Sequence, residues 1–302
     1  MRKAAAAVFF LQALIPALLR AQISNIVVTN AASFQAGLPA PGSIGTIFCT
    51  GLSVTGVVSA TGTPLPLSLS GVTVTVGGAS APLFAVADLG GYQQVNFQMP
   101  LQFELDTAPG GTTAVATVIV SQGATTGTSV ASPSMGAFFR VGSTQYGIFQ
   151  HGSDSSLVTT SNPARVGETV VGYATGLEPP NPPVPAGEAT PLSPLYFVPQ
   201  NPGALNGEIP RDLNGIYIKD SRGTESDIFT FSGAPGGYGF MGLAPGMVGV
   251  YQINFIMPSV ASGNATIGLA GQTCRQNIFG NYCDTPGSVL VTTGTPVIIP
   301  VQ

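Results

Sequence analysis

Apolar and polar residues alternate with a period of two along several short segments of the chain. The clearest segment is Val72–Val76, whose sequence Val-Thr-Val-Thr-Val ends at two glycines. This period places successive side chains on opposite faces of a β-strand. After the first 21 residues, no segment sustains the 3.6-residue period of an amphipathic helix. The pattern predicts an all-β chain, with further strands at residues 113–121, 216–219, 228–231, 265–269 and 289–300.

Two motifs occur twice in the chain, in the same order. The first runs from a glycine through a β-rich segment to Thr-Gly-Leu, at residues 42–52 and again at 167–177. The second is Gln-x-Asn-Phe-x-Met-Pro, at residues 94–100 and 252–258. Short strands separated by turns, repeated once along the chain, predict two tandem immunoglobulin-like β-sandwich domains.

The spacing of the motifs sets the expected domain boundaries. We expect a first sandwich at residues 22–142 and a second at 143–302. The second copy has about 33 more residues between its motifs than the first, which places an extra segment near residues 178–235. Its proline-rich start is interpreted as a stiff loop inside the second domain.

The first 21 residues have the layout of a secretory signal peptide. Arg2 and Lys3 form a basic head, an apolar run follows, and Ala21 provides a small residue before a cut at Gln22. A membrane anchor is the alternative, but the run is short and Pro16 interrupts it. No later stretch is apolar for long enough to span a membrane, so the mature protein is expected to be secreted, extracellular or held at the cell envelope.

The charge of the chain argues against nucleic acid as a partner. Only 7% of the residues are charged, and Lys219 is the one lysine left after the signal peptide. The acidic balance repels phosphate backbones. Ser, Thr, Asn and Gln side chains must therefore supply most of the polar surface.

The three cysteines fit an oxidising compartment. Cys274 and Cys283 enclose a short loop-like segment, and a disulfide between them is the favoured interpretation. A metal pair is the alternative, although the single histidine leaves few further ligands. Cys49 lies in a strand pattern and is expected to behave as a buried, inert small hydrophobic residue.

A series of motifs suggests a family. Asn30-Ala-Ala-Ser-Phe34, Pro41-Gly42-Ser43, Gln94-Val-Asn-Phe97, Asn162-Pro-Ala164, Thr175-Gly-Leu177 and Leu243-Ala-Pro-Gly246 followed by Tyr251-Gln-Ile-Asn254 occur in this order. The series resembles the uncharacterised paralogous C-terminal domain family of Acidobacteria known from Solibacter. The resemblance implies exported pairs of immunoglobulin-like (TIG-like) sandwiches and no catalytic residues.

The repeated Gln-x-Asn strands allow two interpretations. Alternation turns Gln94, Asn96 and Gln98 to one face of their strand, and Gln252 and Asn254 do the same in the second copy. These amides form either a sugar-binding face or structural hydrogen bonds to nearby loop backbone, and recurrence in both copies favours the structural role. The chain has no Trp, and seven of its eight Tyr follow residue 145, so an aromatic recognition surface is expected on the second domain.

Acidic residues gather in the extra segment of the second domain. Asp212, Asn214, Asp220 and Asp227 are weak candidates for a Ca²⁺ site, and a solvated hairpin is the favoured alternative. A glycan-acting hydrolase would need two carboxylates of this segment, Glu225 included, to converge in a cleft. Glu104 and Asp106 are the other close acidic pair and are interpreted as the edge of a turn.

The sequence contains no recognisable catalytic constellation. His151 is the only histidine, and the segment around it is interpreted as a polar turn. We therefore expect no enzymatic activity and no cofactor. The favoured function is a non-catalytic interaction or structural module for an unknown extracellular protein or glycan, with a carbohydrate-binding module as the first alternative and the hydrolase as the second.

Overall fold

The protein is all-β in the computed structural model, which describes residues 22–108, 114–198, 214–228, 238–274, 276–277, 280–281 and 289–302. The described residues contain no α-helix, and every strand pairing is antiparallel. The expected signal peptide and Cys283 lie outside the described residues, as do the side chains of residues 214, 215, 226–228, 238 and 270–293. The Cys274–Cys283 disulfide therefore stays a prediction.

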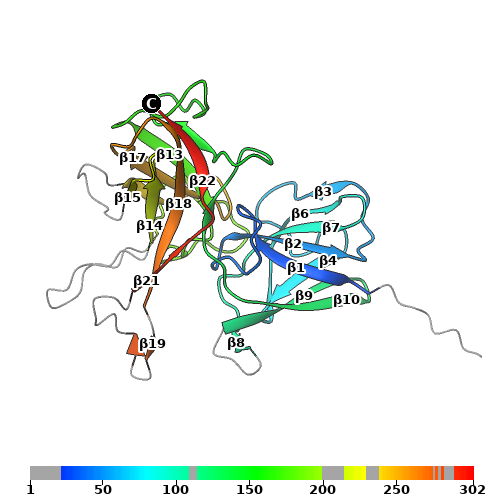
Figure 1. Ribbon diagram of the computed structural model, residues 1–302. Coiled ribbons are helices and arrows are strands. Elements are labelled where there is room, and N and C mark those ends of the chain that lie inside the picture. The colour runs from blue at the N-terminus through cyan, green and yellow to red at the C-terminus, as the bar shows by residue number, and fades with distance from the viewer. Residues whose placement is uncertain are drawn as a thin grey trace, which may run out of the picture.

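The first half of the chain forms a two-sheet sandwich (Figure 1). Its front sheet has the order β1 (Ser24–Asn30), β2 (Ile44–Thr50), β7 (Gln93–Gln98), β6 (Leu83–Asp88) and β3 (Val57–Ser59). Its back sheet has the order β10 (Thr125–Ala131), β9 (Ala114–Gln122), β4 (Val72–Val76) and β5 (Ala79–Ser80), with β8 (Asp106–Thr107) also paired to β9.

The second half forms another two-sheet sandwich beside the first (Figure 1). Its front sheet has the order β11 (Ala137–Phe138), β13 (Thr169–Thr175), β17 (Tyr251–Ile256) and β16 (Tyr238–Leu243), and β12 (Phe149–His151) also pairs with β13. Its back sheet has the order β15 (Glu225–Ile228), β14 (Asn214–Lys219), β18 (Gly263–Cys274) and β21 (Val289–Thr293), with β22 (Val297–Val301) also on β18. A small ribbon joins β19 (Gln276–Asn277) and β20 (Gly280–Asn281).

The two halves share one strand order. In each front sheet the strand with the Gln-x-Asn motif, β7 or β17, lies between the strand that ends in Thr-Gly-Leu and β6 or β16. The chain passes from the sheets of the first sandwich to those of the second between Ala131 and Ala137, since β11 already pairs with β13. This passage lies a few residues before the expected 142/143 boundary.

Each sandwich has its own apolar core, built from the inward faces of its two sheets. The predicted alternation of β7 and β17 is confirmed, since the residues between the amides, Val95 and Phe97 in one strand and Ile253 and Phe255 in the other, are fully buried. Cys49 is buried as expected, and this burial raises the pKa of its thiol to about 11. A thiol in such a site stays protonated and unreactive at neutral pH.

A buried polar junction joins the two sandwiches. The amide of Ile44, at the start of β2, donates to Thr175 Oγ1 at 2.8 Å. The amide of Gly176, at the end of β13, donates in return to Ser43 Oγ at 3.0 Å. The Thr175 hydroxyl donates onward to the carbonyl oxygen of Gly249 at 2.9 Å. Ser43 and Thr175 are completely buried, so these bonds are shielded from competing water.

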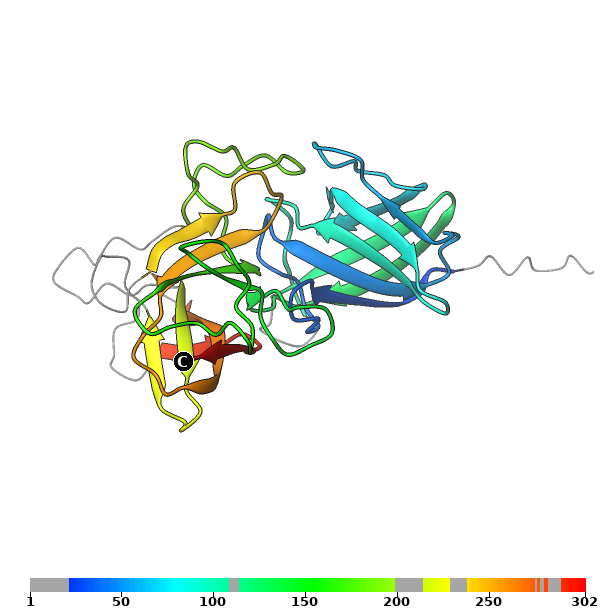
Figure 2. The same cartoon turned by 90° about the horizontal axis from the view of Figure 1, so that it is seen from above.

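Gln98 extends the junction at its edge. It lies on the predicted face of β7, but it is buried because the second sandwich covers it. The amide of Gly187 donates to its Oε1 at 2.6 Å, and its Nε2 donates to the carbonyl oxygen of Gly42 at 2.9 Å. The carbonyl of Gly187 also accepts the amide of Leu65, so the proline-rich loop of the second sandwich reaches the first (Figure 2). The stiff loop therefore serves as part of the contact between domains.

Gly176 is required at the junction by its backbone and its surroundings. Its φ is +92°, and a Cβ there would lie 2.7 Å from the Cα of Gly136 and 2.8 Å from Asn30 Nδ2. Asn30 is itself buried, and its Nδ2 donates to the carbonyl oxygen of Met135 in the connection between the sandwiches. The Thr-Gly-Leu motif of the second copy thus packs directly against the interdomain connection.

We predict that Thr175→Val destabilises the protein by about 2–4 kcal/mol, since it leaves the part-buried amide of Ile44 and the buried carbonyl of Gly249 without partners. Urea denaturation gives the free energy of unfolding. The matched control is Thr50→Val at the same motif position in the first copy, where the hydroxyl bonds only exposed groups. Equal losses for the two variants would contradict the junction's role.

Candidate functional site

The Gln-x-Asn motifs form the same amide pair in both front sheets. Gln94 Nε2 donates to Asn96 Oδ1 at 2.8 Å, and Gln252 Nε2 donates to Asn254 Oδ1 at 2.9 Å. All four side chains are half-buried. The expected bonds to loop backbone are not the ones observed, because each Asn instead accepts from the Gln two residues earlier on its own strand.

Each amide pair leaves the Nδ2 group of its Asn and the Oε1 atom of its Gln outside the internal hydrogen bond. Asn96 Oδ1 also accepts the Thr46 hydroxyl at 3.0 Å, so the first pair is held from two directions. Among the described residues, the Nδ2 groups of Asn96 and Asn254 and the Oε1 atoms of Gln94 and Gln252 have no hydrogen-bond partner. A primary amide keeps two donors and two acceptor lone pairs, so both pairs retain capacity for a ligand.

An aromatic ring lies across the strand from each glutamine. Phe48 of β2 is the register partner of Gln94, and Tyr173 of β13 is the register partner of Gln252. Residues directly opposite in adjacent antiparallel strands place their side chains side by side on one face. The ring and the amide pair therefore form one unit that recurs in both sandwiches.

The first sandwich adds two exposed rings to this unit. Phe34 lies 6.1 Å from Phe48 and Tyr92 lies 5.8 Å from it, measured between ring centroids. Phe34 is 55% exposed and Tyr92 is 45% exposed. We call Phe34, Phe48 and Tyr92 the aromatic cluster. The positions of the tyrosines predicted an aromatic recognition surface on the second domain. This cluster lies on the first sandwich instead, and two of its three rings are phenylalanines.

Phe34 occupies an unfavourable backbone conformation. Its φ is +56°, a region that bulky residues rarely adopt. The turn is fixed by Asn30, whose Oδ1 accepts the amides of Ala32 and Ser33. A large exposed ring held at positive φ adds little to stability, and such outliers concentrate at functional positions.

The rings of the cluster do not form a flat platform. The interplanar angles are 49° for Phe34 with Phe48 and 62° for Phe48 with Tyr92. A sugar-stacking site needs coplanar exposed rings, so recognition by stacking alone is not supported at this cluster.

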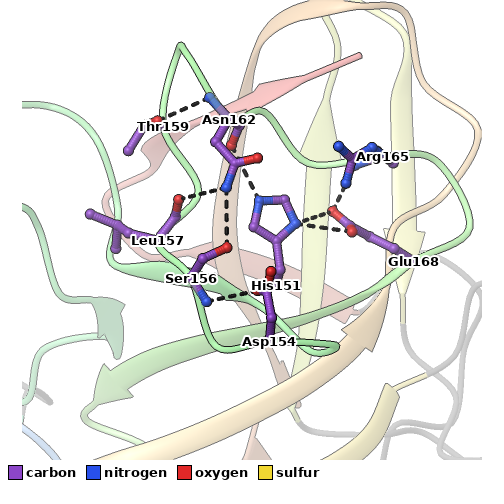
Figure 3. A network of polar contacts seen from close by, with 8 residues as sticks. All are labelled: His151, Asp154, Ser156, Leu157, Thr159, Asn162, Arg165 and Glu168. Atoms are coloured by element: carbon purple, nitrogen blue, oxygen red, sulfur yellow. Dashed lines mark hydrogen bonds and ion pairs between the residues drawn. The ribbon is translucent and has the colours of Figure 1, made fainter.

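The expected polar turn is present at residues 152–154, while His151 itself is buried at the end of β12 (Figure 3). Its Nδ1 lies 2.9 Å from Glu168 Oε1, and its Nε2 lies 3.2 Å from the carbonyl oxygen of Asn162. Both ring nitrogens therefore lie within hydrogen-bond distance of an oxygen atom of the protein. The ring is 2% exposed and has no nitrogen free for a substrate.

The neighbouring polar residues do not form a nucleophile triad (Figure 3). Asp154 accepts the amide of Ser156, and this bond, with that from the Ser156 hydroxyl, lowers the pKa of the Asp154 carboxyl. Asn162 Nδ2 donates to Ser156 Oγ at 3.1 Å. The carboxylate that contacts His151 is Glu168, not Asp154, so the network ties the loop between β12 and β13 to the sheet.

The structure describes the side chain of only one of the four Ca²⁺ candidates, Asp220. Asp212 lies outside the described residues, as do the side chains of Asn214 and Asp227. No cluster of three or more His, Cys, Asp or Glu occurs among the described residues. Glu225 is exposed, and so are Glu104 and Asp106 on the first sandwich.

The carboxylate of Asp220 accepts four hydrogen bonds at the turn between β14 and β15. Its Oδ1 accepts the amides of Arg222 and Thr224 at 2.9 and 2.8 Å, and its Oδ2 accepts the amide of Ala261 at 3.1 Å and Arg222 Nη2 at 3.3 Å. Burial by itself would raise the pKa of Asp220, but these four hydrogen bonds outweigh it and lower the pKa to about 2. With about four lone-pair positions occupied, the carboxylate has none left for a cation.

No protein-family model matches the chain, and no curated protein matches it significantly. The candidate site therefore rests on the geometry of the two amide pairs and the aromatic cluster.

We predict that Asp220→Asn lowers the melting temperature at pH 7, with a difference from wild type that narrows as the pH falls. Because the folded-state pKa lies below the usual value, the stabilisation by ionised Asp220 is complete above about pH 5 and fades from about pH 4 to pH 2. Thermal unfolding monitored by circular dichroism measures this. The control is Glu225→Gln on the same hairpin. A pH-independent difference would show that the charge of Asp220 does not matter.

Proposed function

We propose that the protein is a secreted, non-catalytic binding module that contacts an extracellular partner through the outer face of the first front sheet. The observation that carries the proposal is the aromatic cluster, in which Phe34 is 55% exposed although its φ is +56°. Exposed apolar groups that adjoin fixed polar groups are typical of interaction surfaces.

The surroundings of the cluster support this role. Val27, the register partner of Phe48 on β1, is 47% exposed, so apolar surface continues across the strand. The amide pair of Gln94 and Asn96 borders the cluster on the other side. The outer face thus combines apolar contact area with fixed hydrogen-bonding groups.

A non-catalytic role is supported by the side chains that could take part in catalysis, because each is buried or fully hydrogen-bonded within the protein. His151 is closed off by Glu168 and Asn162, and Asp220 is saturated by amide and guanidinium donors. Cys49 is buried in the first core with a raised pKa.

Export is proposed from the leader pattern, and tandem immunoglobulin-like domains from the shared strand order of the two sandwiches. In the part of the chain that the structure describes, no helix is long and apolar enough to cross a membrane.

We predict that Phe34→Gly weakens binding to isolated cell-envelope material by at least about tenfold without lowering stability. Loss of the half-exposed ring is offset by relief of the left-handed backbone, which costs about 1–2 kcal/mol for a residue with a Cβ. Binding is measured by biolayer interferometry, with and without Ca²⁺, and stability by urea denaturation.

Tyr92→Ser is expected to weaken binding similarly, and Leu192→Ser, at a 77% exposed apolar side chain elsewhere, is the control. Wild-type protein that binds no envelope material, or cluster variants that bind as well as wild type, would refute the proposed function.

A further inference from the structure

The two amide-and-ring units are a chemical arrangement that both sandwiches share on the outer faces of their front sheets. The first consists of Gln94, Asn96 and Phe48, and the second of Gln252, Asn254 and Tyr173. A purely structural amide would be expected to use its polar atoms within the protein. Here the internal bond uses one donor and one acceptor of each pair, and Asn96 Oδ1 also accepts the Thr46 hydroxyl. The Asn Nδ2 and Gln Oε1 atoms of both pairs have no hydrogen-bond partner among the described residues.

The charge around these units restricts the ligand. The chain has no Lys or Arg from Gln22 to Phe139, so the first sandwich has no cation to bind a phosphate, sulfate or uronate group. In the strands of the first front sheet the only charged residue is Asp88, at the end of β6. The strands β13, β16 and β17 of the second front sheet contain no charged residue. The ligand must therefore be recognised by neutral hydrogen bonds and apolar contact.

Fixed amides suit hydroxyl groups. A hydroxyl both donates and accepts, so two adjacent hydroxyls match the free Asn N–H and the free Gln oxygen of one pair. The hydrogen bond inside each pair holds these groups in place before binding, which reduces the entropy lost on association. The adjacent ring offers an apolar edge to the C–H groups that accompany such hydroxyls in a sugar.

We propose that each amide-and-ring unit is a binding site for an uncharged polysaccharide, so that one chain holds two equivalent glycan sites. This inference rests on the proposed binding function and names its ligand class. The duplication favours a polymer with a repeating unit over a protein partner, because a polymer presents the same chemical group to both sandwiches.

The test uses the mature chain, residues 22–302, and isothermal titration calorimetry with neutral hexasaccharides of the cello-, xylo-, manno-, laminari- and malto- series. Oligogalacturonate is the acidic comparison. We expect binding to at least one neutral series with two sites per chain, and no binding of oligogalacturonate.

Asn96→Asp and Asn254→Asp test the sites individually. Each substitution keeps the Oδ1 acceptor for the neighbouring Gln, removes the Nδ2 donor and adds one negative charge. Each is expected to weaken one of the two sites by about tenfold or more, with an unchanged melting temperature. Gln102→Glu and Asn264→Asp add the same charge at exposed positions outside these units and should leave binding unchanged.

The outcomes separate this inference from the proposed function. If no neutral glycan binds, or if binding survives both Asn variants, the glycan sites are refuted. If envelope material is still bound through Phe34 and Tyr92 after periodate oxidation of its glycans, the partner is a protein and only the proposed function stands. If neither glycans nor envelope material bind, both are wrong.

Discussion

The buried exchange of hydrogen bonds between Ser43 and Thr175 determines how this molecule is assembled. Each hydroxyl accepts a backbone amide from the other sandwich. One amide lies where β2 begins, and the other lies where β13 ends. A chain in which only 7% of residues are charged has few ion pairs to place at such a contact. Hydroxyl and amide groups form the contact instead. Because Ser43 and Thr175 are completely buried, the loss of a hydrogen-bond partner there lowers the stability of the folded protein.

The junction determines which part of β7 is covered and which part is exposed. It covers Gln98 at the end of β7 but leaves Gln94 and Asn96, on the same face of that strand, half-exposed. The two sandwiches are therefore joined end to end through loops and strand ends, while the centres of both front sheets face outward. The proposed binding units occupy these centres.

The all-β fold and the inward residues could be predicted from the sequence because the period of two directly reflects strand geometry. Val72–Val76, for example, is a strand with the predicted bounds. Strand ends were less predictable, since β18 runs from Gly263 to Cys274, well beyond the predicted residues 265–269. Asp220 looked like a Ca²⁺ ligand in sequence, whereas its partners, such as the amide of Ala261, are 41 residues away and visible only in the structure.

The proposed binding surface could be predicted only in part from the sequence. The repeat drew attention to Gln94, Asn96, Gln252 and Asn254, but the ring beside each glutamine depends on strand register. Phe34 lies in a loop with no periodic pattern, so its exposure and its contact with Phe48 could not be inferred. The positive φ of Phe34 likewise has no sequence signal.

We infer that the buried junction makes the two sandwiches one cooperative unit. Differential scanning calorimetry of residues 22–302 tests this cooperativity. We expect a single transition whose calorimetric and van't Hoff enthalpies are equal, since neither sandwich can unfold without exposing the junction. Two separate transitions, one for each sandwich, would contradict it.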